Sequence, residues 1–330
     1  MRTRGRKVPF VLAGLLVAAF LSPAAAASAP TYASSSYARH PVIAFSTGFI
    51  LNFPDTENPS QVVTVRPDGT DERQLTHVPD GKQAGAPDIS PDGGTIAYVS
   101  NQGGDNFAVY AMNVDGSGQH RLFGKAGFDF FQPRWSPDGT RFVVTRCDSS
   151  VGFLTNCDIV LVKRDGSGAR TLVGGGRYSG NATFSPDGKW IAFDSDRAGY
   201  VSTVWVLRLA GGSPTRVTKP DLEAFWPNWS PDGSHLVISS NCCRPVSQVF
   251  TMRKDGSQLK QLTHTTAGGG AGFASYSPDG RQIVFSSDER RGPDYASSDL
   301  FVMNADGTHA HRIVDDQQFA IGGDWSRGEW

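Results

Sequence analysis

A four-residue phrase, Ser-Pro-Asp-Gly, recurs through this chain and limits its possible folds more than any other feature. The copies begin at Ser90, Ser136, Ser185, Ser230 and Ser277, and a degenerate sixth copy places Ser326 at the same position. Successive copies begin 45 to 49 residues apart. A period of this length, with several strand-like runs in each repeat, is typical of the blades of a β-propeller.

Each repeat reads as four short strands joined by tight turns. In the third repeat, the apolar run 142–145 follows the Ser-Pro-Asp-Gly turn, and a second run, 159–162, leads into an Asp165-Gly166 turn. Proline presets φ in such turns and glycine tolerates positive φ, and Asp-Gly between apolar runs is a strong hairpin signal. We therefore predict an all-β protein, a six-bladed β-propeller of four-stranded antiparallel blades.

The two ends of the repeat region complement each other. The run 41–46 aligns with the second strand of a blade, so the first blade lacks its innermost strand. The C-terminal run 323–326 aligns with 228–230, which leads into an internal Ser-Pro-Asp-Gly turn. We expect the C-terminal strand to pair with the N-terminal blade and close the ring, which leaves no open sheet edge between the ends. The propeller then occupies residues 40–330.

Three sequence patterns resemble a known family. The W-S-P-D-G turn, the I-x-F-x-S strand and the V-M-x-x-D-G-[ST] segment ending in L-T are similar to the WD40-like (PD40) repeats of TolB-like six-bladed propellers. The resemblance covers about Arg39 to Trp330. It implies the fold but not one activity, because the family includes the periplasmic TolB component of the Tol-Pal system, propeller domains of prolyl-oligopeptidase-type peptidases and some secreted lyases.

The N-terminus has the three parts of a secretory signal peptide. Arg2, Arg4, Arg6 and Lys7 precede an apolar run at 10–21, and Ala25-Ala26-Ala27 offers a small-residue cleavage site. A run of 12 residues is short for a membrane anchor. We expect residues 1–27 to be removed, residues 28–39 to form a flexible leader, and the mature protein to be secreted or periplasmic without a stable membrane anchor.

The charge balance of the mature chain argues against nucleic acid as a partner. Without the predicted signal peptide the chain carries 27 basic and 32 acidic residues, and the basic ones are scattered among the acids. A nucleic-acid-binding protein is expected to show a basic patch or stripe. We expect a monomer whose partner is an extracytoplasmic protein, peptide or glycan.

Four cysteines in an exported chain suggest disulfides. Cys147 and Cys157 flank the loop between the second and third strands of the third blade, so we predict a bond between them. Cys242 and Cys243 are adjacent in the equivalent loop of the fifth blade. Because adjacent cysteines form a strained ring, either that pair is a vicinal disulfide or one of them pairs elsewhere.

The sequence offers no established catalytic motif. Gly-x-Ser-x-Gly, His-Glu-x-x-His, Gly-x-x-x-x-Gly-Lys and Cys-x-x-Cys are all absent from it. His77 and His264 both follow Leu-Thr at the same repeat position and are the candidate metal ligands, with polar loop residues as the alternative reading. The aspartates of the repeated turn are expected to be structural, because an aspartate in a turn accepts backbone N–H bonds. We therefore name no catalytic residue and no cofactor.

The loops suggest which face of the ring binds a ligand. The tight turns repeat almost unchanged on one face, whereas the opposite face carries loops that vary in length and composition, and variable loops on a rigid scaffold usually carry function. Aromatic residues in the connections between blades, with polar neighbours, are the candidate ligand-binding residues, and packing between blades is the alternative for each aromatic. The candidates are Phe130, Phe131, Arg177, Tyr178, Arg197, Glu223, Phe225 and Trp226.

Two classes of function follow from this reading. The favoured one is a secreted, non-catalytic propeller that binds a protein, peptide or cell-envelope ligand at its loop-rich face. The alternative is a secreted hydrolase or lyase with its site in the mouth of the channel. Convergent polar groups with perturbed pKa values in the channel would favour the enzyme, and a broad, shallow apolar surface would favour the binder.

Overall fold

The computed structural model describes most of the chain from residue 41 onward. The described residues are 13–15, 41–48, 59–104, 106–154, 156–175, 177–242, 246–265, 269–288, 298–315 and 320–326. Most of the predicted signal peptide, its cleavage site, the leader 28–39 and Cys243 lie outside them. Within the described ranges every regular element is a β-strand, and no helix is long and apolar enough to cross a membrane.

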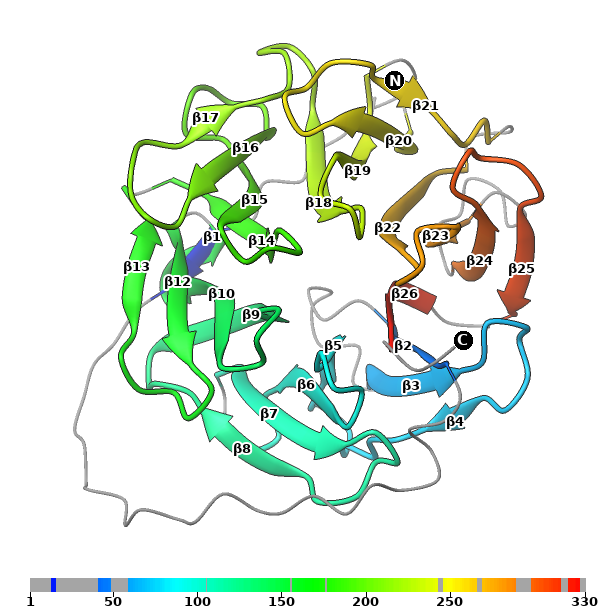
Figure 1. Ribbon diagram of the computed structural model, residues 1–330. Helices are drawn as coiled ribbons and strands as arrows, with labels where there is room; N and C mark the ends of the chain where they lie inside the picture. The colour runs from blue at the N-terminus through cyan, green and yellow to red at the C-terminus, as the bar shows by residue number, and fades with distance from the viewer. Residues whose placement is uncertain are drawn as a thin grey trace, which may run out of the picture.

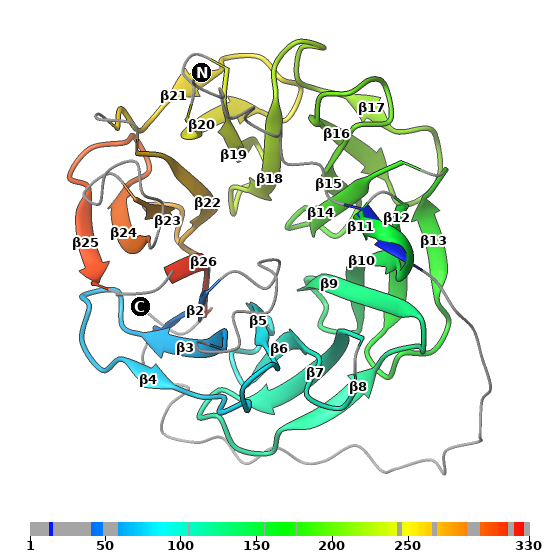
Figure 2. The same ribbon diagram turned by 180° about the vertical axis from the view of Figure 1, so that it is seen from behind.

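Six four-stranded antiparallel sheets surround a central channel, which confirms the predicted propeller (Figures 1 and 2). We number them as blades 1 to 6 and give their strands from the channel outward. Blade 1 consists of β26 (Ala320–Trp325), β2 (Ile43–Thr47), β3 (Gln61–Val65) and β4 (Arg73–Gln74). Blade 2 consists of β5 (Ala84–Ile89), β6 (Thr95–Ser100), β7 (Ala108–Asn113) and β8 (His120–Phe123). Blade 3 consists of β9 (Phe128–Trp135), β10 (Arg141–Asp148), β12 (Cys157–Lys163) and β13 (Arg170–Val173).

The other three blades follow the same order in the chain. Blade 4 consists of β14 (Ser179–Phe184), β15 (Trp190–Ser195), β16 (Thr203–Arg208) and β17 (Thr215–Arg216). Blade 5 consists of β18 (Ala224–Trp229), β19 (His235–Ser240), β20 (Gln248–Arg253) and β21 (Lys260–Gln261). Blade 6 consists of β22 (Ala271–Tyr276), β23 (Gln282–Ser287), β24 (Asp299–Asn304) and β25 (His311–Val314).

The ring closes as the sequence predicts. Strand β26, from the C-terminus, pairs antiparallel with β2, so that Trp325 lies opposite Ile43 (Figure 1). Two further bonds fasten the end of the chain, because the Ser326 N–H donates to the Val42 carbonyl and the Val42 N–H donates to Ser326 Oγ, each at 2.8 Å. The two ends of the repeat region therefore share one sheet, and blade 1 has no unpaired inner edge on its second strand.

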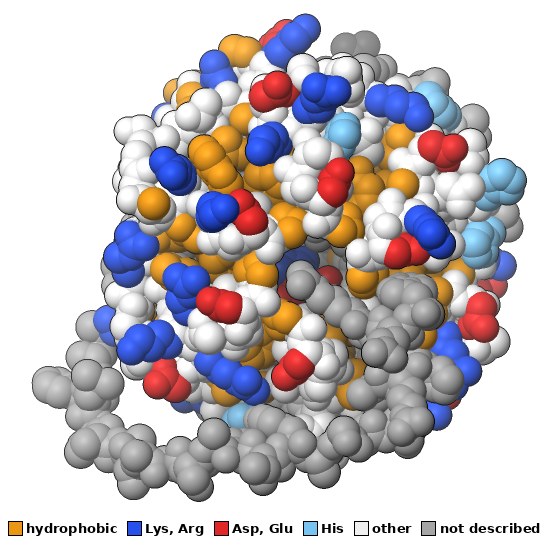
Figure 3. Space-filling view, in the orientation of Figure 1, with side chains coloured by type: hydrophobic (Ala, Val, Ile, Leu, Met, Phe, Trp, Pro, Cys, Tyr) orange, Lys and Arg blue, Asp and Glu red, His pale blue; other side chains and the backbone are white. Residues whose placement is uncertain are grey.

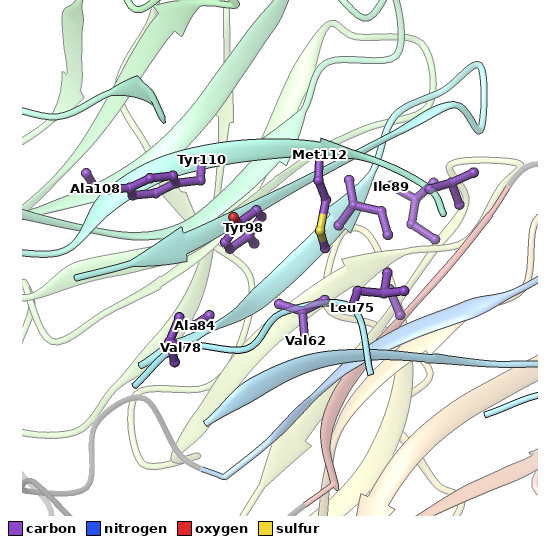
Figure 4. Close-up of a cluster of buried hydrophobic side chains, with 12 residues drawn as sticks. Val62, Leu75, Val78, Ala84, Ile89, Tyr98, Ala108, Tyr110 and Met112 are labelled. Atoms are coloured by element: carbon purple, nitrogen blue, oxygen red, sulfur yellow. The ribbon is translucent and has the colours of Figure 1, made fainter. Parts of the chain in front are cut away.

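The hydrophobic core is divided among the interfaces between blades. Between blades 1 and 2, Val62 and Leu75 face Tyr98 and Met112, and all four side chains are buried (Figure 4). Equivalent clusters join each following pair of blades, and the cluster between blades 6 and 1 contains Trp325. Because burial of apolar surface is the dominant favourable contribution to folding, every interface contributes to the stability of the ring.

A small additional sheet lies outside the blades. Strand β1 (Ala13–Leu15) pairs antiparallel with β11 (Ser150–Leu154), which belongs to the loop between β10 and β12. Since β1 falls within the segment that we predict to be removed on export, we assign it no part in the mature propeller.

The predicted bond between Cys147 and Cys157 is present. The two residues lie opposite each other at the ends of β10 and β12, with Cα atoms 4.1 Å apart. Both are buried, and they pack against Phe131. Cys242 is disulfide-bonded as well. The bond in blade 3 ties the base of that blade's long loop.

The closure of the ring can be tested at Trp325. Its Nε1 donates to the Ser275 carbonyl of blade 6 at 3.3 Å, just as Trp229 Nε1 in blade 5 donates to the Thr183 carbonyl of blade 4 at 3.2 Å. Trp325→Ala and Trp229→Ala should therefore each lower the free energy of unfolding by about 3 to 5 kcal/mol, as buried tryptophan truncations do. Urea unfolding measures both; a Trp325→Ala protein close to wild type beside a strongly weakened Trp229→Ala protein would contradict ring closure.

The disulfide can be tested by its effect on stability. Replacing Cys147 and Cys157 together by serine should lower the free energy of unfolding by about 2 to 3 kcal/mol, because the bond restricts the unfolded chain. Denaturant unfolding with and without dithiothreitol measures this effect. Any change that dithiothreitol causes in the double variant comes from the disulfide of Cys242 and is subtracted. If the oxidised wild type and the double variant unfold at the same denaturant concentration, the bond does not stabilise the fold.

Candidate functional site

The two faces of the ring differ in chemistry. Antiparallel connectivity places the Ser-Pro-Asp-Gly and Asp-Gly turns on one face, the turn face, and places the loops between second and third strands, with the connections between blades, on the opposite loop face. In every intact turn the serine Oγ donates to the aspartate at 2.5 to 2.6 Å. The Ser136 and Ser230 hydroxyls thereby lower the pKa of Asp138 and of Asp232 to about 2. The turn aspartates are structural, as predicted.

Every innermost strand contains a bulge that faces the channel. In all six blades the register with the second strand shifts at the same place, and the residue there has a positive φ, between 43° and 61°. A bulge re-aims a side chain, and bulges are frequent beside functional sites. The six bulge residues are Ala86, Gln132, Asn181, Trp226, Phe273 and Gly322.

The bulge residues are held by the preceding blade. In five blades a polar side chain near the end of the second strand accepts the bulge N–H of the next blade at 2.9 to 3.2 Å. Blade 2 differs, because Val99 occupies the equivalent position. The five accepting residues are Ser46, Thr145, Asp194, Ser239 and Ser286. We call these contacts the inter-blade bonds; they fix where the channel-lining side chains point.

The channel wall is mostly uncharged. The six bulge residues line a cavity, and in blades 3 to 6 the residues two positions further along the strand, Arg134, Thr183, Asn228 and Ser275, line it as well. Gly48, just after β2, places the cavity toward the loop face. Its one charged lining residue in the described chain is Arg134, whose NH1 donates to Asp88 at 2.9 Å. Burial lowers the pKa of Arg134, but the carboxylates of Asp88 and Asp324 outweigh burial and raise it. Figure 3 shows charges of both signs spread around the central hollow of one face.

Three aromatic residues gather where blades 5 and 6 meet the channel. The rings of Trp226 and Phe273 stack with centroids 3.6 Å apart, and Phe225 meets Trp226 edge-on at 4.8 Å. All three side chains are half-buried, and Trp226 and Phe273 line the cavity. Partly exposed aromatic rings beside a cavity are typical of binding sites for ligands with an apolar face.

A buried carboxyl group lies behind this aromatic cluster. Asp194 is 1% exposed, and its Oδ1 accepts the Trp226 N–H at 3.2 Å and Asn181 Nδ2 at 2.8 Å, while Oδ2 accepts the Ser202 hydroxyl at 3.1 Å. Burial raises the pKa of Asp194 to about 7, although these bonds oppose the change. Asn181 Nδ2 also contacts the Tyr178 hydroxyl at 2.8 Å. A perturbed carboxyl group beside a cavity is a feature of functional sites.

Two of the sequence candidates are in the wrong place for ligand contact. Phe130 and Phe131 are 7% and 3% exposed, and they pack in the cores that join blade 3 to its neighbours. Their burial favours the alternative, packing between blades, since Phe130 and Phe131 precede the bulge at Gln132 and align with Ala224 and Phe225 of β18. Trp226 and a residue outside the candidate set, Phe273, line the channel cavity, and Phe225 meets the Trp226 ring edge-on beside it.

The polar candidates lie on the loop face. Arg177 is exposed, donates to the Gly199 carbonyl at 2.9 Å and lies over the ring of Tyr200, which is 95% exposed. Arg197 lies over the Trp205 ring, and exposed Glu223 accepts a bond from Asn241. Tyr178 is half-buried, and burial raises its pKa well above the ordinary value. Only Tyr178 of this set joins the network of Asp194.

The candidate metal ligands do not converge with other ligands. His77 and His264 are both exposed, and His77 Nδ1 lies 3.0 Å from the Gln74 amide. Among the described residues no group of three or more His, Cys, Asp or Glu side chains is placed to hold a metal ion.

Asp194 and Asn181 are functional candidates that the sequence patterns above do not single out. The signal was present, because aligning the second strands places Asp194 where the other blades carry Ser46, Val99, Thr145, Ser239 and Ser286. A carboxylate in a position otherwise filled by hydroxyl or apolar groups is a local departure from the repeat. In a repeat protein such departures mark positions that do more than maintain the fold.

A family model confirms the fold assignment. The model described as TolB beta propeller domain (PD40) matches residues 49–239 and 200–329. An uncharacterized protein of Agrobacterium fabrum is 30% identical over 205 residues, which cover 60% of this chain and 67% of that protein. An uncharacterized peptidase of Bacillus subtilis, YuxL, is 29% identical over 210 residues, or 52% of this chain, and the match spans 31% of the peptidase.

Solved structures show the same architecture. TolB from Acinetobacter baumannii matches with a TM-score of 0.70 at 20% identity, over 86% of this chain and 66% of that one. An oligogalacturonate lyase in complex with manganese matches with a TM-score of 0.54 at 17% identity, over 78% of this chain and 71% of the lyase chain. At such identities the likeness concerns the fold alone, and one fold supports many activities.

The burial of Asp194 should make stability depend on pH. An aspartate in the unfolded chain ionises near pH 4, whereas folded Asp194 keeps its proton up to about pH 7, so its contribution falls as pH rises through this range. Asp194→Asn cannot ionise. Relative to wild type, it should gain about 2 to 3 kcal/mol of unfolding free energy between pH 5 and pH 8. Urea unfolding of both proteins measures this; parallel pH profiles would show that Asp194 ionises normally.

Proposed function

The chain belongs to the family of TolB β-propeller domains (PD40), and from that premise we propose that it is an extracytoplasmic, non-catalytic binding protein. Its ligand is a protein, peptide or cell-envelope glycan that docks at the loop-face mouth of the channel. The observation that carries the proposal is the cluster of Phe225, Trp226 and Phe273, where half-buried aromatic rings border the cavity. Central aromatic residues commonly provide most of the energy of an interface.

The contrast between the two faces supports this location. On the turn face, each Ser-Pro-Asp-Gly turn makes the same internal bonds, so its polar groups are already used. On the loop face, Arg177, Tyr200 and Glu223 are exposed and differ from blade to blade. Exposed, varied groups around an aromatic centre form the polar rim and apolar core that interfaces share.

Two independent features support an extracytoplasmic location. The first 27 residues have the composition of a secretory signal peptide, so the mature chain begins near Ser28. Cys147 and Cys157 form a disulfide, and disulfides persist in oxidising compartments. We propose that the protein acts outside the cytoplasm as a monomer.

A second candidate function is a hydrolase or lyase with its site in the channel mouth. The observation in its favour is Asp194, a buried carboxyl group with a pKa of about 7 whose partner Asn181 lines the cavity. A group with a pKa near the working pH is suited to general acid–base catalysis. Asp194 itself is 1% exposed, so a substrate would have to be reached through Asn181. This placement favours the binding function.

The binding function is tested at Trp226. Pull-down from envelope and culture-medium fractions, with a glycan array beside it, identifies the ligand, and calorimetry then measures its affinity. Trp226→Ala, alone or with Phe225→Ala and Phe273→Ala, should weaken binding by at least about tenfold, because truncating a central aromatic hot spot commonly costs about 2 kcal/mol or more. The melting temperature of Trp226→Ala should fall much less than that of a core variant such as Trp229→Ala.

Trp205→Ala is the matched control. Trp205 is also half-buried, but it lies on β16 under Arg197 and Arg216, away from the channel. Its loss should leave binding intact. If Trp226→Ala and Trp205→Ala weaken binding equally, the channel mouth is not the binding site. Turnover of an envelope polysaccharide or peptide that Asp194→Asn abolishes would assign the protein to the enzyme class.

A further inference from the structure

One inter-blade bond is built differently from the others. Where blades 1, 5 and 6 use the hydroxyls of Ser46, Ser239 and Ser286 to accept the next bulge N–H, blade 4 uses the carboxyl group of Asp194. A serine hydroxyl is sufficient for this bond, since it makes the bond at 2.9 to 3.2 Å elsewhere in the ring. The carboxyl group of Asp194 makes further bonds besides the one that holds Trp226.

The further bonds of the Asp194 carboxyl group join it to two side chains. Besides the Trp226 N–H, Oδ1 accepts Asn181 Nδ2 at 2.8 Å, and Oδ2 accepts the Ser202 hydroxyl at 3.1 Å. The second hydrogen of the Asn181 amide points to the Tyr178 hydroxyl at 2.8 Å. Two acceptors, Asp194 Oδ1 and the Tyr178 hydroxyl, thus hold the nitrogen of the Asn181 amide and fix its orientation.

The oxygen of this amide is left without a partner. Asn181 is 8% exposed, and its Oδ1 is a buried acceptor with no hydrogen-bond donor among the described residues. Asn181 lines the channel cavity beside Trp226 and Phe273. Buried polar groups are nearly always hydrogen-bonded, so an orphaned acceptor at a cavity wall indicates a donor that arrives from the cavity.

The rest of the wall indicates the chemistry of the ligand. Besides glycine and apolar residues, the cavity is lined by neutral side chains that can donate and accept hydrogen bonds, and its charged residue, Arg134, is ion-paired with Asp88. Amide and hydroxyl groups around a stacked aromatic pair match a ring that carries hydroxyls at its edge and C–H groups on its face. The neutral polar residues are Ser46, Gln132, Asn181, Thr183, Asn228 and Ser275.

We propose that the channel holds a subsite for a neutral sugar ring, in which Asp194 is a positioning residue that presents Asn181 Oδ1 to a ligand hydroxyl beside Trp226 and Phe273. This inference deepens the proposed binding function and rests on it for the location of the site. A neutral sugar is favoured over an acidic one because the guanidinium of Arg134 is already neutralised by Asp88 and lies near Asp324.

The arrangement makes binding depend on pH. Ionised Asp194 can only accept, so its Oδ1 holds the Asn181 nitrogen. Protonated Asp194 can donate, and it then holds the Asn181 oxygen once the amide has turned around. Tyr178 and Asp196 are the other titratable groups near this network, and Arg177 lies 3.9 Å from Asp196. Ser202 and the Trp226 N–H approach from the remaining sides without titrating. Affinity should therefore rise as pH increases through the ionisation of Asp194.

The test measures binding of cellotetraose, maltotetraose and chitotetraose by calorimetry at pH 5 and pH 8. Tetragalacturonate and a Gly/Ser peptide of similar length are the comparison probes. We expect at least one neutral tetrasaccharide to bind, about three- to tenfold more tightly at pH 8 than at pH 5, as the gain or loss of one hydrogen bond allows. Preferential binding of the acidic sugar or of the peptide would overturn the assignment to neutral sugars.

Two substitutions at position 194 separate positioning from folding. Asp194→Ser restores the residue of blades 1, 5 and 6, so it should keep the bond to the Trp226 N–H and the fold but weaken sugar binding about three- to tenfold. Asp194→Asn keeps an acceptor for Asn181 without a charge, so it should bind the sugar equally well at pH 5 and pH 8. A folded Asp194→Ser protein that binds as wild type does would refute the positioning role.

A direct readout of Asn181 distinguishes this inference from the proposed function. In the ligand-free protein, the side-chain amide resonances of Asn181 should shift between pH 5 and pH 8 in the wild type and stay constant in Asp194→Asn. If the Asn181 resonances of the wild type do not change with pH, Asp194 does not control Asn181, even if the channel mouth captures a protein ligand. Loss of all capture, with the amide shift intact, would instead count against the proposed function.

Discussion

The hydrogen bond between one blade and the bulge of the next is the interaction on which the rest of the structure depends. A bulge residue with positive φ leaves its N–H outside the ladder of its own sheet, and an unpaired buried N–H is costly. The second strand of the preceding blade supplies the acceptor in five of the six blades. The same contact therefore joins neighbouring blades, stabilises the bulge and directs its side chain into the channel.

Function in such a ring is expected where the repeat is broken. The hydroxyls of Ser46, Ser239 and Ser286 make the inter-blade bond and little else, so they maintain the scaffold. Asp194 makes that bond and also holds Asn181, at the expense of burying an ionisable group whose pKa rises to about 7. Next to it, aromatic residues occupy two successive bulges, Trp226 and Phe273, where other blades carry small or amide residues. The departures from the repeat thus gather on one side of the channel.

Much of this architecture could be predicted from the sequence because it is repeated. The period of the Ser-Pro-Asp-Gly turn gives the number of blades, the missing strand of blade 1 gives the closure through Trp325, and two cysteines across one hairpin give the disulfide. The site could be predicted only in part. Phe130 and Trp226 both belong to innermost strands, but the position of the bulge decides that the first is buried between blades and the second lines the channel. The bond from Asp194 to Trp226 crosses 32 residues of sequence and depends on the rotation between blades, which local patterns do not reveal.

A double-mutant cycle between Asp194 and Asn181 tests the central claim most directly. The free energy of ligand capture is measured for wild type, Asp194→Ser, Asn181→Ala and the double variant, at a pH where Asp194 is ionised. If the carboxylate acts on the ligand through the amide, the two losses should not add, and the coupling energy should be about 1 kcal/mol or more. If the double variant loses the sum of the two single losses, Asp194 does not position Asn181, and its burial beside the channel needs another explanation.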